Sequence, residues 1–259
     1  MFLLKLCDMM GTMIYDHGYL DMATPAQMDA LWAEGWRHFG RMFFRYETSL
    51  HENNFYTVWP IRLCPKDFKP SRSHKRTLKK NSDIKVNIMP AFIDEAALTL
   101  FDIHKQRFSN NVPQSIYDFL SPAPAFMPCS CMRLELYLVN KLIGLSFLDI
   151  GERATSSVYQ CFDPEYEDRA LGILMILLSI DYSHQQGKDW YYPGYVYKEA
   201  SFYDYKKQFR PWFYYDWQGH WLDEPNETAS QPIQAYDYLV SLLDQADLQE
   251  HDKTSGEIH

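Results

Sequence analysis

The chain has 259 residues, enough for one large domain or two modest ones, and 46% of them are hydrophobic, as in a globular protein with a real core. Its 34 Asp and Glu outnumber its 25 Lys and Arg, so the formal net charge is −9. Five cysteines, an odd and scattered set, argue against a disulfide framework and indicate a reducing compartment.

The N-terminal segment MFLLKLCDMMGTMI is apolar but does not have the pattern of a signal peptide or a membrane span. Its apolar runs are short, and Lys5 and Asp8 interrupt them. No other stretch approaches the required length. We therefore expect a cytoplasmic protein with no membrane partner.

A helix is predicted over residues 25–40. Thr24 can cap it, Pro25 suits its first turn, and Gly35 is the residue at which we expect it to end. Aromatic and β-branched runs between 42 and 63 then favour strands around a polar turn.

Positive charge is concentrated between residues 66 and 80, which we call the basic segment. Its cations are Lys66, Lys69, Arg72, Lys75, Arg76, Lys79 and Lys80. Without the basic segment the chain carries 18 positive and 33 negative charges. Ser71 favours a helix start, and a helix over 72–81 would place several of the cations on one face. Such a cluster in an acidic chain indicates a polyanionic partner, and the alternative is a solvated helix face.

The rest of the chain predicts the order strand, helix, three strands, helix and strand. The ranges are 84–90, 93–108, 132–139, 142–151, 156–162, 169–186 and 189–197. A two-residue link favours a hairpin between the second and third strands. This is an α+β layout on a mostly antiparallel sheet, and it resembles the acetyltransferase-like (GNAT) fold. An acidic tail follows from residue 222, with a short amphipathic helix expected over 233–246 and a disordered end.

The junction before the second long helix carries half of a phosphate-binding pattern. Arg169 and Gly172 fit an Arg-x-x-Gly-x-Gly/Ala loop, but Leu174 occupies the place of the last small residue. Two interpretations stay open. The junction is an anion site for coenzyme A at a helix N-terminus, or Gly172 allows close packing of helix against sheet.

Several segments occur in an order that carries a family resemblance. They are SRSHKRTLKKN (71–81), SSVYQCFDP (156–164), LGILMIL (171–177), YYPGY (191–195) and YKKQFRP (205–211), preceded by GWRHFGRMFFR (35–45) and PIRL (60–63). Over residues 30–217 the chain resembles the aminoacyl-tRNA–protein transferases, the arginyl- and leucyl-transferases of the N-degron pathway. The resemblance implies transfer of an amino acid, arginine or leucine, from charged tRNA to the N-terminal amine or another acceptor group of a protein or peptide. It implies no cofactor besides the charged tRNA.

The resemblance also implies a domain organisation. We expect a smaller N-terminal α/β domain at 1–85, a GNAT-like catalytic domain at 86–221 and a partly disordered tail at 222–259. The basic segment would then lie at the seam between the two domains. The oligomeric state stays open.

The chain departs from the family in two places. The family usually has a cysteine cluster in its N-terminal domain, with one cysteine just before Pro-Leu-Arg. Here Val58 and Trp59 precede Pro60 and residues 11–63 contain no cysteine, so a metal, haem or iron–sulfur role does not carry over. Ala200, Phe202 and Tyr203 stand where the family typically has Cys-x-Lys-Met. The acceptor and the transferred amino acid therefore stay open.

No metal site is expected from the spacing of possible ligands. Cys129 and Cys131, in PCSC, have no second pair of ligands at zinc spacing. His38, His74 and His104 likewise stand alone.

Asp163 and Tyr159 are the predicted catalytic residues, because a carboxylate or a tyrosine could take a proton from the attacking amine. Asp163 could instead anchor an α-ammonium group, or simply make a turn and cap the next helix. The predicted substrate-binding residues are Ser156, Ser157, Gly172, Gly194, Tyr195, Tyr205, Lys206 and Arg210. The predicted tRNA-binding residues are Arg72, Lys75, Arg76, Lys79 and Lys80.

Two other functions compete with aminoacyl transfer. Arg169 and Gly172 would suit a GNAT acyltransferase that uses acyl-coenzyme A. The lost cysteines would suit a noncatalytic tRNA-binding protein.

Overall fold

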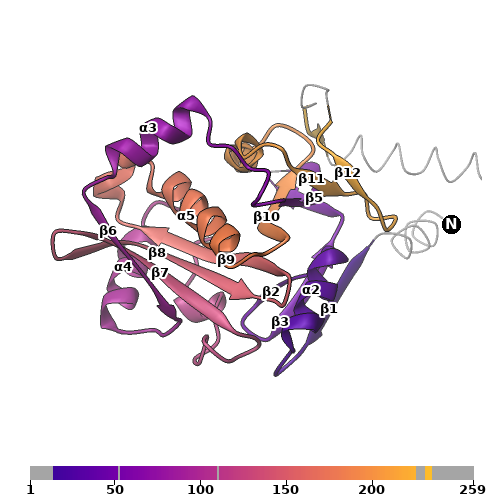
Figure 1. Cartoon of the computed structure of the whole chain (residues 1–259). Coiled ribbons are helices and arrows are strands. Elements are labelled where there is room, and N and C mark those ends of the chain that lie inside the picture. Colours follow the sequence, from indigo (N-terminus) through magenta and orange to yellow (C-terminus); the bar gives the residue numbers. More distant parts are fainter. Residues whose placement is uncertain (1–13, 52, 110, 226–230, 235–259) are drawn as a thin grey trace, which may run out of the picture.

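The structure, a computed structural model, describes residues 14–51, 53–109, 111–225 and 231–234. It contains a large sheet with helices on both faces and a small sheet packed beside it (Figure 1). The small sheet has the order β1–β3–β2 and is antiparallel throughout. Its strands are β1 (Tyr15–Tyr19), β2 (Arg37–Phe39) and β3 (Met42–Tyr46).

The large sheet has ten strands, eight of them in the order β12–β11–β5–β10–β9–β8–β7–β6. The strands on this path are β5 (Asn54–Leu63), β6 (Ile84–Pro90), β7 (Cys131–Leu138), β8 (Lys141–Ile150), β9 (Ala154–Phe162), β10 (Trp190–Tyr197), β11 (Phe213–Tyr215) and β12 (Trp221–Asp223). Off this path, β4 (Thr48–His51) and β13 (Ile233–Gln234) pair with β5. Among the described strands, β9 and β10 form the one parallel pair.

Two helices cover the two faces of the large sheet. Neighbouring residues of β8 point to opposite faces, and Phe147 packs with α4 (Glu95–Lys105) while Leu148 packs with α5 (Leu171–Gln185). Both residues are buried. The remaining helices are α2 (Pro25–Ala33), α3 (Arg72–Lys80) and the 3₁₀ segments η1 (Ile116–Asp118), η2 (Pro164–Arg169) and η3 (Phe202–Gln208).

The α+β, GNAT-like fold predicted from the sequence is confirmed. Strands β6 to β9 run antiparallel in chain order, and α5 then crosses over to β10, which returns parallel to β9. The basic helix was also predicted correctly, because Ser71 caps α3 by accepting from the backbone N–H of His74.

The helix predicted over 25–40 is shorter than expected. Thr24 and Gln27 form a capping box at its start, but α2 ends at Ala33. Gly35 has a φ of +82°, a left-handed conformation that turns the chain toward β2. The helix therefore ends two residues before Gly35, close to the expected end. Arg37, which lay within the predicted helix, lies in strand β2.

The proposed boundaries at 85 and 221 stay predictions. Strand β5 comes from the N-terminal part of the chain, yet it lies between β10 and β11 in the large sheet. The amphipathic helix expected over 233–246 and the end of the tail fall mainly outside the described residues. Within the described residues, we found no helix with the length and apolar character needed to cross a membrane.

Strands β9 and β10 stay together for only three residues. Their pairing runs from Ala154 to Ser156 on β9 and from Trp190 to Tyr192 on β10. On its other side β10 pairs with β5 at Tyr191 and, after a shift in register, from Gly194 to Tyr197. We call the point where β9 and β10 separate the strand fork.

Candidate active site

Arg37 lies at the strand fork. It comes from β2 of the small sheet, and its guanidinium donates to the hydroxyl of Ser156 and to the backbone carbonyl of Ser157. Ser156 is the last residue of β9 that pairs with β10. The side chain thus fixes the small sheet to β9 where the large sheet divides.

A second cation, Lys206 of η3, lies on the other side of the fork. Its Nζ donates to the carbonyl of Tyr195 at 3.0 Å. Gly194 separates the two cations, because a Cβ at that position would lie 3.2 Å from Lys206 Nζ and 3.7 Å from Arg37. Gly194 also has a φ of +108°, so both its conformation and its surroundings favour glycine. We call Arg37 and Lys206 the cation pair.

The cation pair has no acidic partner among the described residues, since neither side chain lies at ion-pair distance from a carboxylate. Lys206 is half-buried, and burial together with the nearby Arg37 lowers its pKa to about 7. Burial also lowers the pKa of Arg37 from its usual value. Two adjacent cations in a partly enclosed place, one of which lowers the pKa of the other, indicate a binding site for an anion.

Tyrosines surround the cation pair. Tyr195 donates through its hydroxyl to the carbonyl of Gly35 at 2.7 Å, and its ring meets that of Tyr46 edge-on at 5.3 Å. Lys206 Nζ lies 5.1 Å from the ring of Tyr203. Burial raises the pKa of Tyr205 to about 12 and the pKa of Tyr46 and Tyr195 further. These phenols are therefore neutral near pH 7 and suited to hydrogen bonding rather than to proton abstraction.

The structure brings six of the eight predicted substrate-binding residues to the fork or directly beside it. They are Ser156, Ser157, Gly194, Tyr195, Tyr205 and Lys206. Ser157 additionally bonds through its hydroxyl to that of Tyr191 at 2.7 Å, which joins the fork to the core beneath α5. Their roles in binding stay predictions.

Gly172 and Arg210 lie elsewhere. Gly172 is in the first turn of α5, where a Cβ would make only an ordinary contact with Phe162 at 3.7 Å, so close packing does not require a glycine. Arg210 is exposed and pairs with Glu224 at 2.8 Å.

The two predicted catalytic residues are also separate from the cation pair. Asp163 lies seven residues beyond Ser156, which is roughly 23 Å along an extended strand. It is buried, accepts from the backbone N–H of Glu165 at 3.0 Å and pairs with Lys141 at 2.9 Å. This is the turn-and-cap arrangement that the sequence left open as the alternative.

Tyr159 faces α4 rather than the cation pair. Its ring stacks on Phe119 at 4.1 Å, and its hydroxyl is buried without a hydrogen-bond partner among the described residues. Burial raises its pKa far above the usual value, which opposes a role as a base. The catalytic roles of Asp163 and Tyr159 remain predictions.

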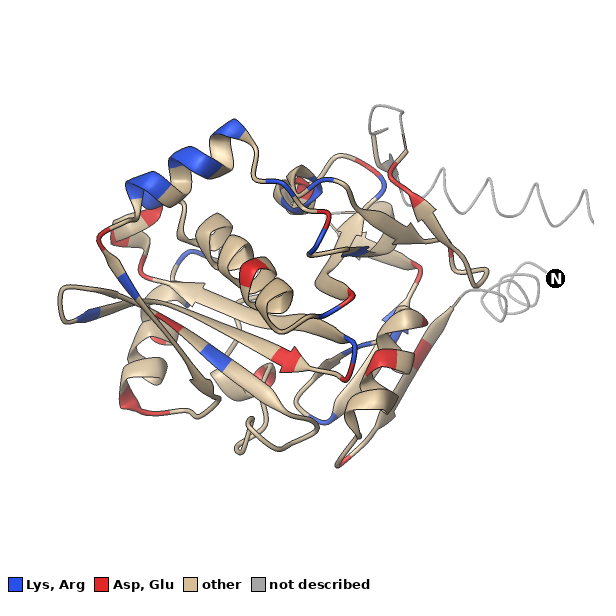
Figure 2. Cartoon of the chain, in the orientation of Figure 1, with Lys and Arg blue, Asp and Glu red and all other residues tan. Residues whose placement is uncertain are grey.

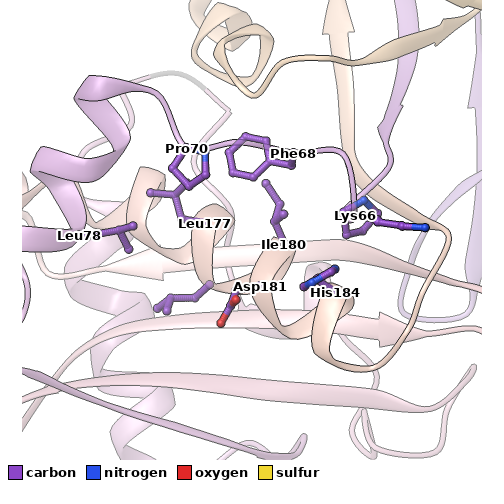
Figure 3. A pocket seen from close by; sticks show the side chains of 10 residues that line it. Lys66, Phe68, Pro70, Leu78, Leu177, Ile180, Asp181 and His184 are labelled. Carbon is purple, nitrogen blue, oxygen red and sulfur yellow. The ribbon is translucent and has the colours of Figure 1, made fainter.

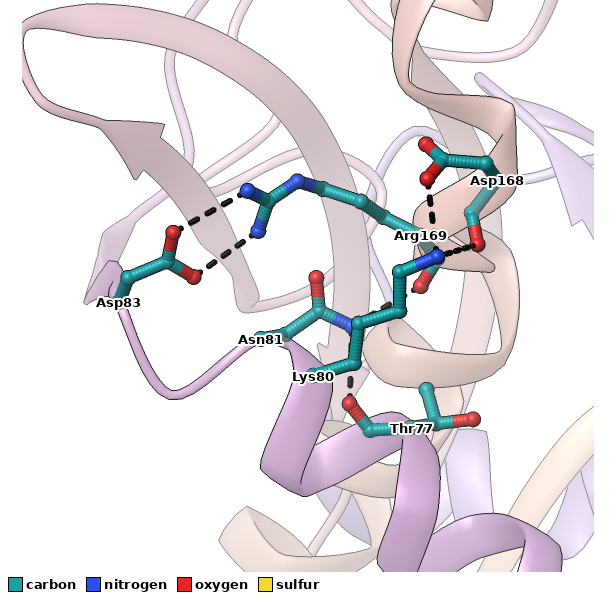
Figure 4. Close-up of polar contacts among 6 residues, drawn as sticks. All are labelled: Thr77, Lys80, Asn81, Asp83, Asp168 and Arg169. Carbon is teal, nitrogen blue, oxygen red and sulfur yellow. Dashed lines mark hydrogen bonds and ion pairs between the residues drawn. The ribbon is translucent and has the colours of Figure 1, made fainter.

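Arg169 belongs to the half phosphate-binding pattern at the start of α5. Arg169 and its neighbour Asp168 contact other residues of the protein (Figure 4). Arg169 pairs with Asp83 through both guanidinium nitrogens, at 2.9 and 3.1 Å. Lys80 bonds to the carbonyl and carboxylate of Asp168, and Asn81 bonds to the carbonyl of Arg169. These contacts fasten the end of α3 to the start of α5.

The basic segment forms an exposed row of cations along α3 (Figure 2). The five predicted tRNA-binding residues Arg72, Lys75, Arg76, Lys79 and Lys80 are all exposed. Lys80 pairs with Asp168 at 2.8 Å, whereas the other four have no carboxylate partner among the described residues. Contact with tRNA stays a prediction for all five.

A groove of about 340 Å³ lies between the chain leading into α3 and the outer side of α5 (Figure 3). Phe68 and Leu78 line one side and Leu177 and Ile180 the other. None of its lining residues belongs to the fork. The groove is mainly apolar and holds no constellation suited to acyl transfer.

Known proteins resemble the chain over most of its length. A family model described as "Arginine-tRNA-protein transferase, C terminus" matches residues 97–216. An aspartate/glutamate leucyltransferase from Shewanella sp. (strain MR-4) is 30% identical over 194 residues, which cover 73% of this chain and 78% of that protein. The chain belongs to the aminoacyl-tRNA–protein transferase family. A second such leucyltransferase, from Marinobacter nauticus, is 29% identical to this transferase over 77% of the chain and 83% of the relative.

The solved structure of FemX is more distant from this aminoacyl-tRNA–protein transferase. A crystal structure of FemX matches with a TM-score of 0.42 at 10% identity, over 78% of this chain and 69% of that chain.

Sequence reasoning missed Arg37, the residue that completes the cation pair. It lies in the family-like segment GWRHFGRMFFR, but three arginines there offer no basis for choosing among them. In the structure Arg41 pairs with Asp21 and Arg45 pairs with Asp16, whereas Arg37 has no such partner among the described residues. This difference is visible only in the three-dimensional structure.

Proposed function

We propose that this enzyme transfers leucine from leucyl-tRNA to the N-terminal amine of proteins that begin with aspartate or glutamate. Its family transfers amino acids from charged tRNA to proteins, and the relatives described above are named aspartate/glutamate leucyltransferases. The single observation in this chain that carries the finer assignment is the cation pair without an acidic partner at the strand fork.

The cation pair would anchor the side-chain carboxylate of the acceptor. Arg37 already uses two donors on β9, so it is held in place, and Lys206 supplies ammonium donors from the opposite side. The same positive charge would repel an arginyl side chain, which supports leucine as the transferred residue. The neutral tyrosines around the fork offer both hydrogen bonds and apolar surface.

The reaction needs little more than correct placement. The free acceptor amine attacks the ester carbonyl of the aminoacyl-tRNA, a C–N bond forms, and the C–O bond to the terminal ribose breaks. The amine loses one proton, and the ribose hydroxyl gains one. Because the ester is already activated, holding the amine next to it would supply much of the rate enhancement.

A panel of charged tRNAs and acceptor peptides tests this proposal. Radiolabelled leucyl-tRNA and arginyl-tRNA are each incubated with peptides that begin with Asp, Glu, Asn or Gln and are otherwise identical. We expect leucine transfer to Asp and Glu at least about 30-fold faster than to Asn and Gln, since a charge-assisted bond contributes about 2 kcal/mol.

An N-acetylated Asp peptide controls for reaction at the terminal amine and should receive nothing. Transfer of arginine instead of leucine, or equal transfer to Asp and Asn peptides, would contradict the proposed specificity.

A further inference from the structure

A second polar cluster lies directly behind Arg37. It contains His38 of β2, Cys129 just before β7 and Asp149 near the end of β8. These residues are 5%, 3% and 2% exposed, and their possible ligand atoms all lie within 4.8 Å of one another. The cluster therefore gathers three metal-binding side chains from three distant parts of the chain in a place closed to solvent.

Cys131 lies next to this cluster but is not one of the three residues whose ligand atoms lie within 4.8 Å of one another. It is 3% exposed and packs in the core beside α4. A hollow of about 10 Å³ is lined by His38, Cys131 and Asp149 among others. This volume suits one small ion or one water molecule.

The histidine is oriented as a metal ligand. Its Nδ1 lies 2.9 Å from the carbonyl of Gly40, which makes Nδ1 the donor and turns Nε2 toward the cluster. There Nε2 lies 2.6 Å from Asp149. A backbone carbonyl that holds the outer nitrogen of a ligand histidine is the usual second contact in metal sites.

The donor set selects the kind of metal. A thiol, an imidazole and a carboxylate match the ligands of tetrahedral zinc, which bind at about 2.0 to 2.3 Å. Ligands around such an ion lie roughly 3.3 to 3.8 Å apart. The His38–Asp149 contact would have to lengthen, and the ion would replace the proton that the two side chains now share.

We propose that His38, Cys129 and Asp149 form a buried zinc site that joins the small sheet to the large sheet. Zinc binding releases the protons of the Cys129 thiol and of the His38–Asp149 contact to solvent. Because the three residues are at most 5% exposed, charged tRNA and acceptor cannot reach the ion, so it has a structural role and takes no part in the transfer reaction. It would hold β2, and with it Arg37, against β9.

The spacing of Cys129 and Cys131 along the chain gave no reason to expect this site. His38 and Asp149 are 111 residues apart, and only the packing of β2 against β8 brings them to the Cys129 thiol.

Metal content tests the proposal without any need for activity. Full-length protein is expressed without a metal-binding tag, kept reduced and analysed for zinc by mass spectrometry, and the metal-free form is titrated with Co²⁺. We expect about one zinc per chain and a thiolate-to-cobalt absorption band. Cys129→Ser should weaken zinc affinity about 10- to 100-fold or more.

Cys161→Ser is the matched control, since Cys161 is also buried but packs in the core beside α4. It should retain the zinc. Asp149→Asn conserves the shape of the cluster, and its zinc loss would support the site even if Cys129→Ser failed to fold. The proposal would be wrong if wild-type protein took up neither zinc nor cobalt, or if both Cys129→Ser and Asp149→Asn kept the zinc content of the wild type. The cluster would then be a buried histidine–aspartate pair without a metal.

Discussion

The molecule carries two concentrations of positive charge that differ in their surroundings. Arg37 and Lys206 lie close together at the strand fork, half-buried and surrounded by tyrosines. The cations of α3 are spread along an exposed helix. Charge held in a partly enclosed place interacts strongly with a correctly placed partner, whereas exposed charge interacts weakly and is screened by salt. The fork is therefore suited to choose a substrate, and α3 to increase affinity for a polyanion.

The largest effect is expected from removing Arg37. Arg37→Ala should reduce kcat/KM for an Asp-initiated acceptor about 100-fold or more, because a partly buried charged partner is lost and Lys206 is left alone. Initial rates with saturating leucyl-tRNA measure this effect.

Arg41→Ala is the control for Arg37, because it removes an exposed arginine from the same segment that pairs with Asp21. It should leave transfer unchanged. If both variants fold and transfer at equal rates, the fork does not bind the acceptor.

Lys206 should make acceptor binding depend on pH. Its pKa of about 7 lies below that of an ordinary lysine, so it is a cation below pH 7 and becomes neutral above it. Affinity for an Asp-initiated peptide should consequently fall as pH rises from 7 to 9, by up to about tenfold per pH unit.

Peptide binding measured by calorimetry with uncharged tRNA separates this effect from the chemical step. An N-acetylated peptide, which has no titrating amine, provides the same test for the side-chain site alone. Lys206→Met should bind more weakly at pH 6 and show little change with pH. An unchanged pH profile in Lys206→Met would assign the dependence to another group.

The smallest effect is expected on α3. The double variant Arg76→Ala, Lys79→Ala should weaken tRNA binding a few-fold and reduce the slope of log affinity against log salt by about 1 to 2. Its rate with saturating charged tRNA should stay normal.

Arg41→Ala combined with Arg153→Ala removes the same amount of charge from exposed positions outside the basic segment. This control should change the salt slope much less. Equal slopes in the two double variants would mean that α3 makes no specific contact with tRNA.

Local signals made much of the fold predictable. Ser71 and Thr24 predicted helices that the structure contains, and the two-residue link of Asn140 and Lys141 predicted the β7–β8 hairpin. These features depend on neighbours in the chain, so a pattern of a few residues records them. The family-like segments likewise led to Ser156, Gly194 and Lys206.

Features that depend on distant contacts could not be predicted in this way. Arg37 reaches Ser156 across 119 residues, and nothing near Arg37 in sequence shows that it stays without an acidic partner. The sequence motif around Asp163 suggested a catalytic role. Only the structure shows that its carboxylate forms an ion pair with Lys141. His38 and Cys129 are likewise far apart in the sequence.

The position of β5 has a consequence for the order of assembly during synthesis. This strand leaves the ribosome early, yet its later half must wait for β10 and β11, the partners of residues from Val58 to Leu63. Most of the chain is therefore translated before β5 has a partner strand on each side. Proteins in which strands pair across such long stretches of sequence fold slowly. A fragment beginning at residue 86 would leave β10 with an open edge, a surface to which another chain can pair.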